Sequence, residues 1–266
     1  AIDQGLADGE FTLHYQPVLN SAGEVESLEA LIRWIHDDGT VTAPNSFIPF
    51  AEQSDLIVKL DCWVLRRVVR QLADWTDHPL FGHLSIAVNV SGRHLGHKHF
   101  VDHIKAPLED LGVDPARLIV EITETALLQD SYDSVRKLNA TRALGVRIAI
   151  DDFGTGYTGL THLRTLPIDI IKIDSEFIAR VDDSDSQEAI LVRLIVETGH
   201  LLGAKITAEG VEEPAQVAAL EKLGSDKLQG YLFSRPVAAE DLEPVLQRLA
   251  QPVEPDQPSK PVSALG

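Results

Sequence analysis

One stretch, from Val146 to Tyr157, places two adjacent carboxylates directly after a short apolar run and before a loop rich in glycine. The apolar run is enriched in β-branched residues, which predicts a buried strand. Asp151 and Asp152 end that strand, and an ionised carboxylate is costly to bury unless a cation or strong donors meet it. A single aspartate pair often only caps a turn. A metal site becomes the better interpretation because a related pattern recurs along the chain.

Five further apolar runs also end in polar or charged residues. The residues at their ends are Asn89, Glu121, Lys172, Glu209 and Gln229. Helix-like segments separate the runs, and strands that alternate with helices predict βαβ units and a parallel sheet. In a (β/α)₈ barrel the carboxyl ends of the strands converge on one mouth, where the active sites of this fold lie. The sequence therefore predicts an α/β barrel with these side chains gathered at its mouth.

Length and composition fit one barrel domain. The chain has 266 residues, close to the roughly 250 of a (β/α)₈ barrel. We predict a domain over residues 1–250 and a disordered tail at 251–266, where prolines lie among polar residues without an apolar period. The chain lacks methionine even at its first position, so we expect a domain from a longer protein. No apolar run reaches the roughly 20 residues of a membrane span, and a lone cysteine excludes internal disulfides. We therefore expect a cytoplasmic location, although the full-length protein could be membrane-anchored.

The formal net charge of −18 argues against a groove for a nucleic-acid polymer, which needs a basic surface to meet the phosphates. A small anionic substrate is still compatible with this charge. Such a substrate would be received by bound divalent cations, which invert the local charge, and by basic side chains such as Arg33 and Lys172.

The second expected strand, residues 25–34, has two different faces. One face carries Ser27, Glu29, Leu31 and Arg33, and the other is apolar throughout. On an exposed edge strand, Glu29 and Arg33 would form a pair worth about 1 kcal/mol or less. The apolar face is suited to packing against helices, so we expect Glu29 and Arg33 to face the barrel interior.

A segment rich in histidine follows the third expected strand and contains His94, His97, His99 and His103. Histidines in such number could indicate a second metal site. No carboxylate or cysteine joins these histidines at the spacing of a metal motif, so we interpret the segment as a solvated loop and helix start. Cys62 falls in a helix-like stretch with an apolar residue at every fourth position, and we interpret it as a small core residue.

Several blocks occur in a fixed order along the chain. They include Glu-Ala-Leu from Glu29, Glu-Ile-Thr-Glu from Glu121, Asp-Asp-Phe-Gly-Thr-Gly-Tyr from Asp151, Lys-Ile-Asp from Lys172 and Gln-Gly-Tyr-Leu from Gln229. As a set they resemble the EAL-domain family of bacterial cyclic di-GMP phosphodiesterases. The resemblance implies a modified (β/α)₈ TIM-like barrel with one antiparallel strand, and metal-dependent hydrolysis of cyclic di-GMP to linear pGpG. It also implies a homodimer and fusion to sensory or GGDEF-type domains in second-messenger signalling.

The resemblance also implies a role for each matching residue. The expected ligands of two Mg²⁺ or Mn²⁺ ions are Glu29, Asn89, Glu121 and Asp151 for one ion, and Asp151, Asp152 and Glu209 for the other. Oxygen ligands of this kind suit either metal. Lys172 would orient the attacking water, with Glu209 as proton acceptor. The expected substrate contacts are Gln16, Leu31, Arg33 and Gln229. The departures from the family pattern are Asp55, His94, Thr158 and Gly159, none of which is an expected metal ligand.

Three residues are expected to support the site from outside the ligand set: Glu124, Thr155 and Glu212. Glu124 lies three residues after Glu121, off the face of the strand that carries the ligands. We expect it to accept hydrogen bonds from the loop after Asp152, including from Thr155. The alternative is that Glu124 only caps the next helix.

Two other functions stay open at this point. The chain could be a receptor that binds cyclic di-GMP without cleaving it, although family members of that kind usually lose a ligand, and all are present here. It could also be a barrel phosphatase that acts on another phosphodiester.

Overall fold

The computed structural model describes residues 2–128, 131–154 and 165–251. Thr155, the departures at Thr158 and Gly159, and residues 252–266 of the predicted tail lie outside this part of the chain.

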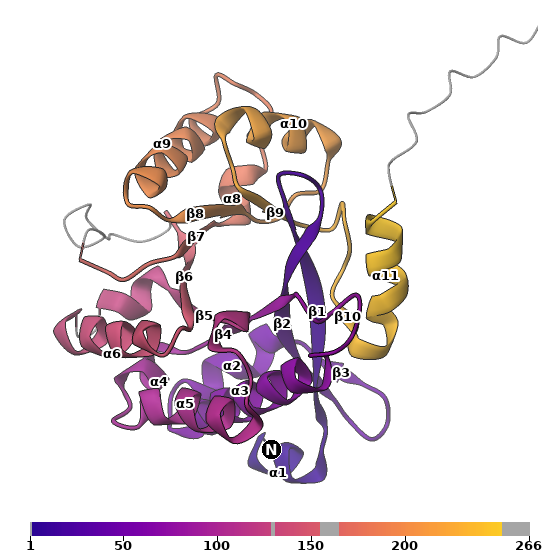
Figure 1. Ribbon diagram of the computed structural model, residues 1–266, viewed down its shortest axis with the longest axis vertical. Coiled ribbons are helices and arrows are strands. Elements are labelled where there is room, and N and C mark those ends of the chain that lie inside the picture. Colours follow the sequence, from indigo (N-terminus) through magenta and orange to yellow (C-terminus); the bar gives the residue numbers. More distant parts are fainter. Residues whose placement is uncertain (1, 129–130, 155–164, 252–266) are drawn as a thin grey trace, which may run out of the picture.

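Eight strands of the described chain close into a barrel (Figure 1). In barrel order they are β1 (Phe11–Asn20), β2 (Val25–Ile35), β4 (Ser85–Asn89), β5 (Leu118–Thr123), β6 (Arg147–Phe153), β7 (Ile170–Ile173), β8 (Lys205–Ala208) and β9 (Lys227–Gln229). β1 pairs antiparallel with both of its barrel neighbours, β2 and β9. The remaining barrel pairs are parallel. The predicted barrel with one antiparallel strand is confirmed.

Helices and short connecting elements surround this barrel, as Figure 1 shows. The helices are α1 (Ile2–Asp8), α2 (Pro44–Ala51), α3 (Leu56–Asp74), α4 (Gly92–Gly96), α5 (Phe100–Leu111), α6 (Ser131–Ala143), α8 (Ser175–Ile178), α9 (Gln187–Leu201), α10 (Pro214–Leu223) and α11 (Leu242–Leu249). Single 3₁₀ turns are η1 (Pro115–Arg117), η2 (Glu124–Leu128) and η3 (Ala239–Asp241), and the short strands β3 (Val41–Thr42) and β10 (Val237–Ala238) extend the sheet. Within the described ranges, no helix has the length and apolar character needed to cross a membrane.

The barrel strands separate two apolar layers. The larger layer lies between strands and helices, where α3 buries Val64, Val68 and Leu72, which are spaced by four residues. The smaller layer consists of Ala87, Ile119, Ala149 and Ile170, which pack against each other on the other face of their strands. Each of these four residues lies two positions before a predicted site residue, so the same face of each strand carries the site one step nearer the mouth.

The strand expected at residues 25–34 is observed as β2, which ends one residue later at Ile35. Helix α2 starts at Pro44, because proline fits the first turn, where its missing N–H has no partner to lose.

Candidate active site

The ammonium group of Lys172 lies at the centre of the barrel mouth, surrounded by four carboxylates. Its Nζ is 2.6 Å from Glu121 Oε2 and 2.6 Å from Glu209 Oε1. Asp151 Oδ1 lies at 3.2 Å and Glu29 Oε2 at 3.3 Å. Lys172 is only 3% exposed. The structure therefore brings together acidic side chains from β2, β5, β6 and the end of β8 around a lysine from β7.

Neutral side chains hold Glu29 in place. Asn89 Nδ2 donates to Glu29 Oε1 at 2.8 Å, and Gln229 Nε2 donates to Glu29 Oε2 at 2.6 Å. Gln229 Nε2 also lies 3.2 Å from Gln16 Oε1, and Gln16 Nε2 donates to the carbonyl oxygen of Ser234 at 3.1 Å. These amides fix one carboxylate of the cluster from the side of β1, β4 and β9.

The crowded charges shift several pKa values. Burial raises the pKa of Glu121 well above its usual range, and the neighbouring carboxylates add to this rise, while Lys172 opposes it. Burial likewise raises the pKa of Glu209 to about 8. At Glu29 burial acts in the same direction, but Lys172, Gln229 and Asn89 together bring the pKa below its ordinary value. The pKa of Lys172 is raised because its carboxylate neighbours outweigh the burial of the ammonium.

Asp152 shares the mouth with Asp151 because β6 is irregular at this point. The pairing of β6 with β7 shifts register between Ile150 and Phe153, and Asp152 has a φ of 52°, in the left-handed region. An irregularity of this kind re-aims side chains next to active sites. Burial, together with Asp151 and Asp174, raises the pKa of Asp152 to about 6. A regular strand would point two successive side chains to opposite faces. Because of the irregularity, Asp151 and Asp152 line the same cavity.

Glu124 supports the chain immediately after Asp152. Its Oε2 accepts a hydrogen bond of 3.0 Å from the backbone N–H of Gly154, and the side chain is buried. Gly154 has a φ of 103°, and a Cβ at this position would lie 3.0 Å from a ring carbon of Phe177. Glu124 thus contacts the backbone of the segment as predicted, while its expected partner Thr155 lies outside the described residues.

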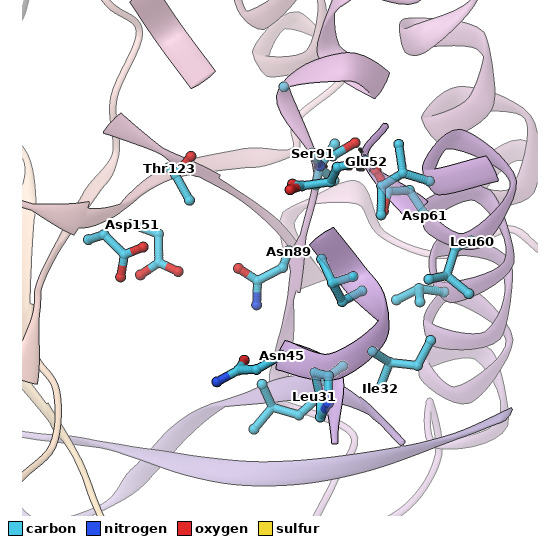
Figure 2. A pocket seen from close by; sticks show the side chains of 18 residues that line it. Leu31, Ile32, Asn45, Glu52, Leu60, Asp61, Asn89, Ser91, Thr123 and Asp151 are labelled. Atoms are coloured by element: carbon cyan, nitrogen blue, oxygen red, sulfur yellow. Dashed lines mark hydrogen bonds between the residues drawn. The ribbon is translucent and has the colours of Figure 1, made fainter. Parts of the chain in front are cut away.

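Two cavities of similar size flank the carboxylate cluster. The first, of about 370 Å³, is lined on the cluster side by Asn89, Asp151 and Asp152. Figure 2 shows the side chains of Asn89 and Asp151 pointing toward one another across it, with Leu31 on a separate wall. The second, of about 350 Å³, is lined by Gln16, Leu31, Glu29, Glu209, Glu212, Gln229 and Tyr231. Leu31 therefore contributes to both cavities.

Sequence comparison identifies the chain. The family model described as "EAL domain" matches residues 1–236. This chain belongs to the EAL domain family. Among solved structures, the EAL domain is similar to "PaMucR Phosphodiesterase, c-di-GMP complex", with a TM-score of 0.86 and 40% identity over 91% of this chain and 97% of that one.

Curated relatives of this EAL domain are longer proteins. It is 41% identical over 247 residues to "Cyclic di-GMP phosphodiesterase NbdA" of Pseudomonas aeruginosa, covering 92% of this chain and 31% of that protein. It is 42% identical over 242 residues to "Bifunctional diguanylate cyclase/cyclic di-GMP phosphodiesterase MucR" of the same organism, covering 90% of this chain and 35% of that protein. The EAL domain thus spans about a third of the length of these relatives.

Two other predicted site residues of the EAL domain, Arg33 and Glu212, lie outside the network around Lys172. Arg33 is half-buried, and its Nη1 donates to the carbonyl oxygen of Ile32 at 2.9 Å. Glu212 lines the second cavity, while its backbone N–H donates to Gln216 Oε1 at 2.8 Å. Neither side chain takes part in the network around Lys172 that the described residues form.

The sequence interpretation missed several residues of the EAL domain. Asn45 and Asp61 line the first cavity from α2 and α3, and no motif marks them. The interpretation of His94 as a solvated residue is wrong, because its side chain is fully buried. The interpretation that no cysteine joins the histidines is also wrong, because Cys62 Sγ lies 3.2 Å from His103 Nδ1. Cys62 lies on α3, far from these histidines in the sequence, so no local motif indicates the contact.

Proposed function

We propose that this EAL domain hydrolyses cyclic di-GMP to linear pGpG with the help of two divalent metal ions. The observation that carries the proposal is the complete cluster at the barrel mouth, in which Glu29, Glu121, Asp151 and Glu209 surround Lys172. The relatives named as cyclic di-GMP phosphodiesterases support it.

The chemistry of this cluster fits metal ions. Four carboxylates meet a single ammonium group, so the cluster carries more acidic groups than Lys172 can neutralise. Carboxylate and amide oxygens suit Mg²⁺ or Mn²⁺. Glu29, Asn89, Glu121 and Asp151 would hold one ion, and Asp151, Asp152 and Glu209 the other. When bound, such a pair lowers the pKa of a water molecule and stabilises the attacking and leaving oxygens of an in-line displacement.

The side chains of the chain would then guide a single displacement at phosphorus. Lys172 orients the attacking water through its ammonium N–H groups, and Glu209, 2.6 Å from Lys172 Nζ, accepts the proton of that water. General-base help of this kind is worth about 10²–10⁴-fold. The water oxygen forms a bond to phosphorus while the bond to the 3′-oxygen breaks. The 3′-oxygen takes up a proton and leaves as a hydroxyl, and the ring of the cyclic dinucleotide opens to linear pGpG.

The two flanking cavities support a substrate with two bases. They have volumes of about 370 and 350 Å³ and lie on either side of the cluster. A cyclic dinucleotide could place one base in each cavity with a phosphate at the carboxylates. Leu31, which lines both cavities, would contact the substrate between its bases, with Gln16 and Gln229 beside it and Arg33 near a phosphate.

A turnover assay tests this proposal directly. Purified protein is incubated with cyclic di-GMP in Mg²⁺, in Mn²⁺, in Ca²⁺ and without metal, and the products are separated by chromatography. We expect pGpG with Mg²⁺ or Mn²⁺ and none without metal. We expect little with Ca²⁺, which takes more ligands in looser geometry than Mg²⁺. Binding without turnover at saturating Mn²⁺ would instead indicate a receptor, and equal cleavage of unrelated phosphodiesters would indicate a different substrate.

Glu124 provides a test of how the segment carrying Asp152 is held. We expect Glu124→Ala to lower kcat by at least about tenfold while the protein stays folded, because changes outside the ligand set at metal sites have effects of about 10–100-fold. Glu124→Gln retains an acceptor oxygen for the Gly154 N–H and should lose less. Unchanged kcat with a slightly lower Tm would favour a capping role, and complete loss of metal binding would make Glu124 a ligand.

The assembly of the protein is part of the same proposal. We infer a homodimer and a position within a longer signalling protein that also carries sensory or GGDEF-type domains. The names and lengths of the curated relatives support the second point, since MucR is named for both a cyclase and a phosphodiesterase activity.

A further inference from the structure

A second cluster of metal-ligating side chains lies among the outer helices. Its members come from three helices: Cys62 from α3, His94 from α4 and His103 from α5. Cys62 Sγ is 3.7 Å from His94 Nε2 and 3.2 Å from His103 Nδ1, and the two nitrogens are 2.9 Å apart. None of the three residues belongs to the carboxylate cluster around Lys172.

These separations are close to those within a tetrahedral zinc site. With Zn–S of about 2.3 Å and Zn–N of about 2.0–2.1 Å, tetrahedral angles place sulfur and nitrogen about 3.6 Å apart and two nitrogens about 3.3 Å apart. Each observed separation lies within about 0.4 Å of these values. Small movements of the side chains would therefore be enough to complete three corners of a tetrahedron.

A carboxylate lies beside the most deeply buried member of this cluster. His94 is fully buried, and its Nδ1 lies 3.4 Å from Asp61 Oδ2, on the side of the ring opposite to Cys62 and His103. The same Asp61 oxygen accepts hydrogen bonds from the Ser91 N–H at 3.0 Å and the Ser91 hydroxyl at 2.7 Å. Histidines that bind a metal usually have their other ring nitrogen against a carboxylate or carbonyl, which fixes the ring orientation.

Hydrogen bonding alone explains this arrangement less well. Each hydrogen bond joins only two of the three atoms, and a neutral imidazole offers only one acceptor nitrogen. A cation is shared by all three atoms at once. Cys62 and His103 are only partly buried, which leaves a path by which an ion could enter.

We propose that Cys62, His94 and His103 bind one zinc ion, with water at the fourth position, and that this ion ties α3, α4 and α5 together. A thiolate with two imidazoles favours zinc over Mg²⁺ or Mn²⁺, which prefer oxygen ligands. The ion is structural and separate from those proposed at the barrel mouth. Because Asp61 and Ser91 also line the first cavity, the zinc site stiffens one wall of that cavity.

Cobalt substitution detects metal binding at this site by absorption spectroscopy, without a measurement of activity. Cys62 is the only cysteine of the chain, so a thiolate-to-cobalt charge-transfer band can come from this site alone. Metal-free protein without a histidine tag is titrated with Co²⁺ in excess Mg²⁺, and then with Zn²⁺. We expect the band to saturate at one Co²⁺ per chain and to disappear as Zn²⁺ displaces it.

Variants separate the zinc site from simple hydrogen bonding. Cys62→Ser should abolish the charge-transfer band and the rise in Tm caused by Zn²⁺. His103→Gln should weaken Co²⁺ binding by at least about tenfold, and Asp61→Asn by about 10–100-fold. His99→Gln, an exposed neighbour in the same segment, is the matched control and should behave as wild type. A titration of the wild-type protein without the band, or an equal effect of Zn²⁺ on the Tm of wild type and Cys62→Ser, would overturn the proposal.

Discussion

Asp151→Asn is expected to abolish the hydrolysis of cyclic di-GMP, with kcat falling by at least about 10³-fold. Asp151 is the residue proposed to contact both metal ions, and metal stabilisation of the transition-state charge is worth several kcal/mol. Asparagine has nearly the same shape, so the strand and the apolar layer around Ala149 should remain intact. The variant therefore removes a charge from the cluster and little else.

Stability measurements test whether the loss of activity in Asp151→Asn comes from loss of metal binding. Without metal, Asp151→Asn should be at least as stable as wild type, because it removes one of four carboxylates crowded around one ammonium group. Mn²⁺ at 100 times its Kd should stabilise wild type by about 2.7 kcal/mol and the variant much less. Asp183→Asn makes the same change at an exposed position and should alter neither property. Undiminished pGpG from Asp151→Asn, measured by chromatography, would refute the proposed ligand set.

Lys172→Met should lower kcat by about 10²–10⁴-fold even at saturating metal, because the water would lose the group that orients it. Methionine keeps the length and apolar stem of lysine but provides no N–H donor. The metal-free variant should also be less stable, since removing one partner of a buried ion pair costs about 3–5 kcal/mol. Added Mn²⁺ should recover part of that stability, because a cation again neutralises the carboxylates.

A second buried lysine in the barrel provides the control. Lys227 on β9 is 4% exposed and its Nζ lies 2.7 Å from Glu26 Oε1. It precedes Gln229 by two residues and is therefore one step further from the mouth. Lys227→Met should lower the Tm and leave kcat within about twofold of wild type. If both methionine variants lost the same fraction of kcat, the loss in Lys172→Met would come from reduced stability. The proposed role of Lys172 in orienting the water would then be refuted.

The sequence predicted the parts of the site that depend on strand geometry. Asn89, Glu121 and Lys172 lie at or within two residues of the carboxyl ends of regular parallel strands, and the two-residue period of such strands is enough to place their side chains at one mouth. The expectation of one antiparallel strand came from the resemblance to a family, and the structure identifies that strand as β1. The apolar pattern of a strand does not encode its direction.

Other features depend on contacts between distant segments and could not be predicted from local patterns. The joint position of Asp151 and Asp152 needs a left-handed φ within a strand, which is uncommon for residues other than glycine. The approach of Cys62 to His94 and His103 depends on how α3 packs against α4 and α5. The spacing of these residues in the sequence resembles no zinc motif, so only the packed structure reveals the cluster.

The inner apolar layer of the barrel determines how molecules can reach the carboxylates. Ala87, Ile119, Ala149 and Ile170 are at most 5% exposed and pack against each other on the inner face of neighbouring strands. A filled barrel interior is a packed core, not a pore, so the described residues leave no passage through the floor. The proposed metal ions and substrate, together with water and product, would then all use the same opening. A dinucleotide lying over the carboxylates would then block the exit of the ions beneath it, so that metal exchange is confined to the interval between product release and the next substrate.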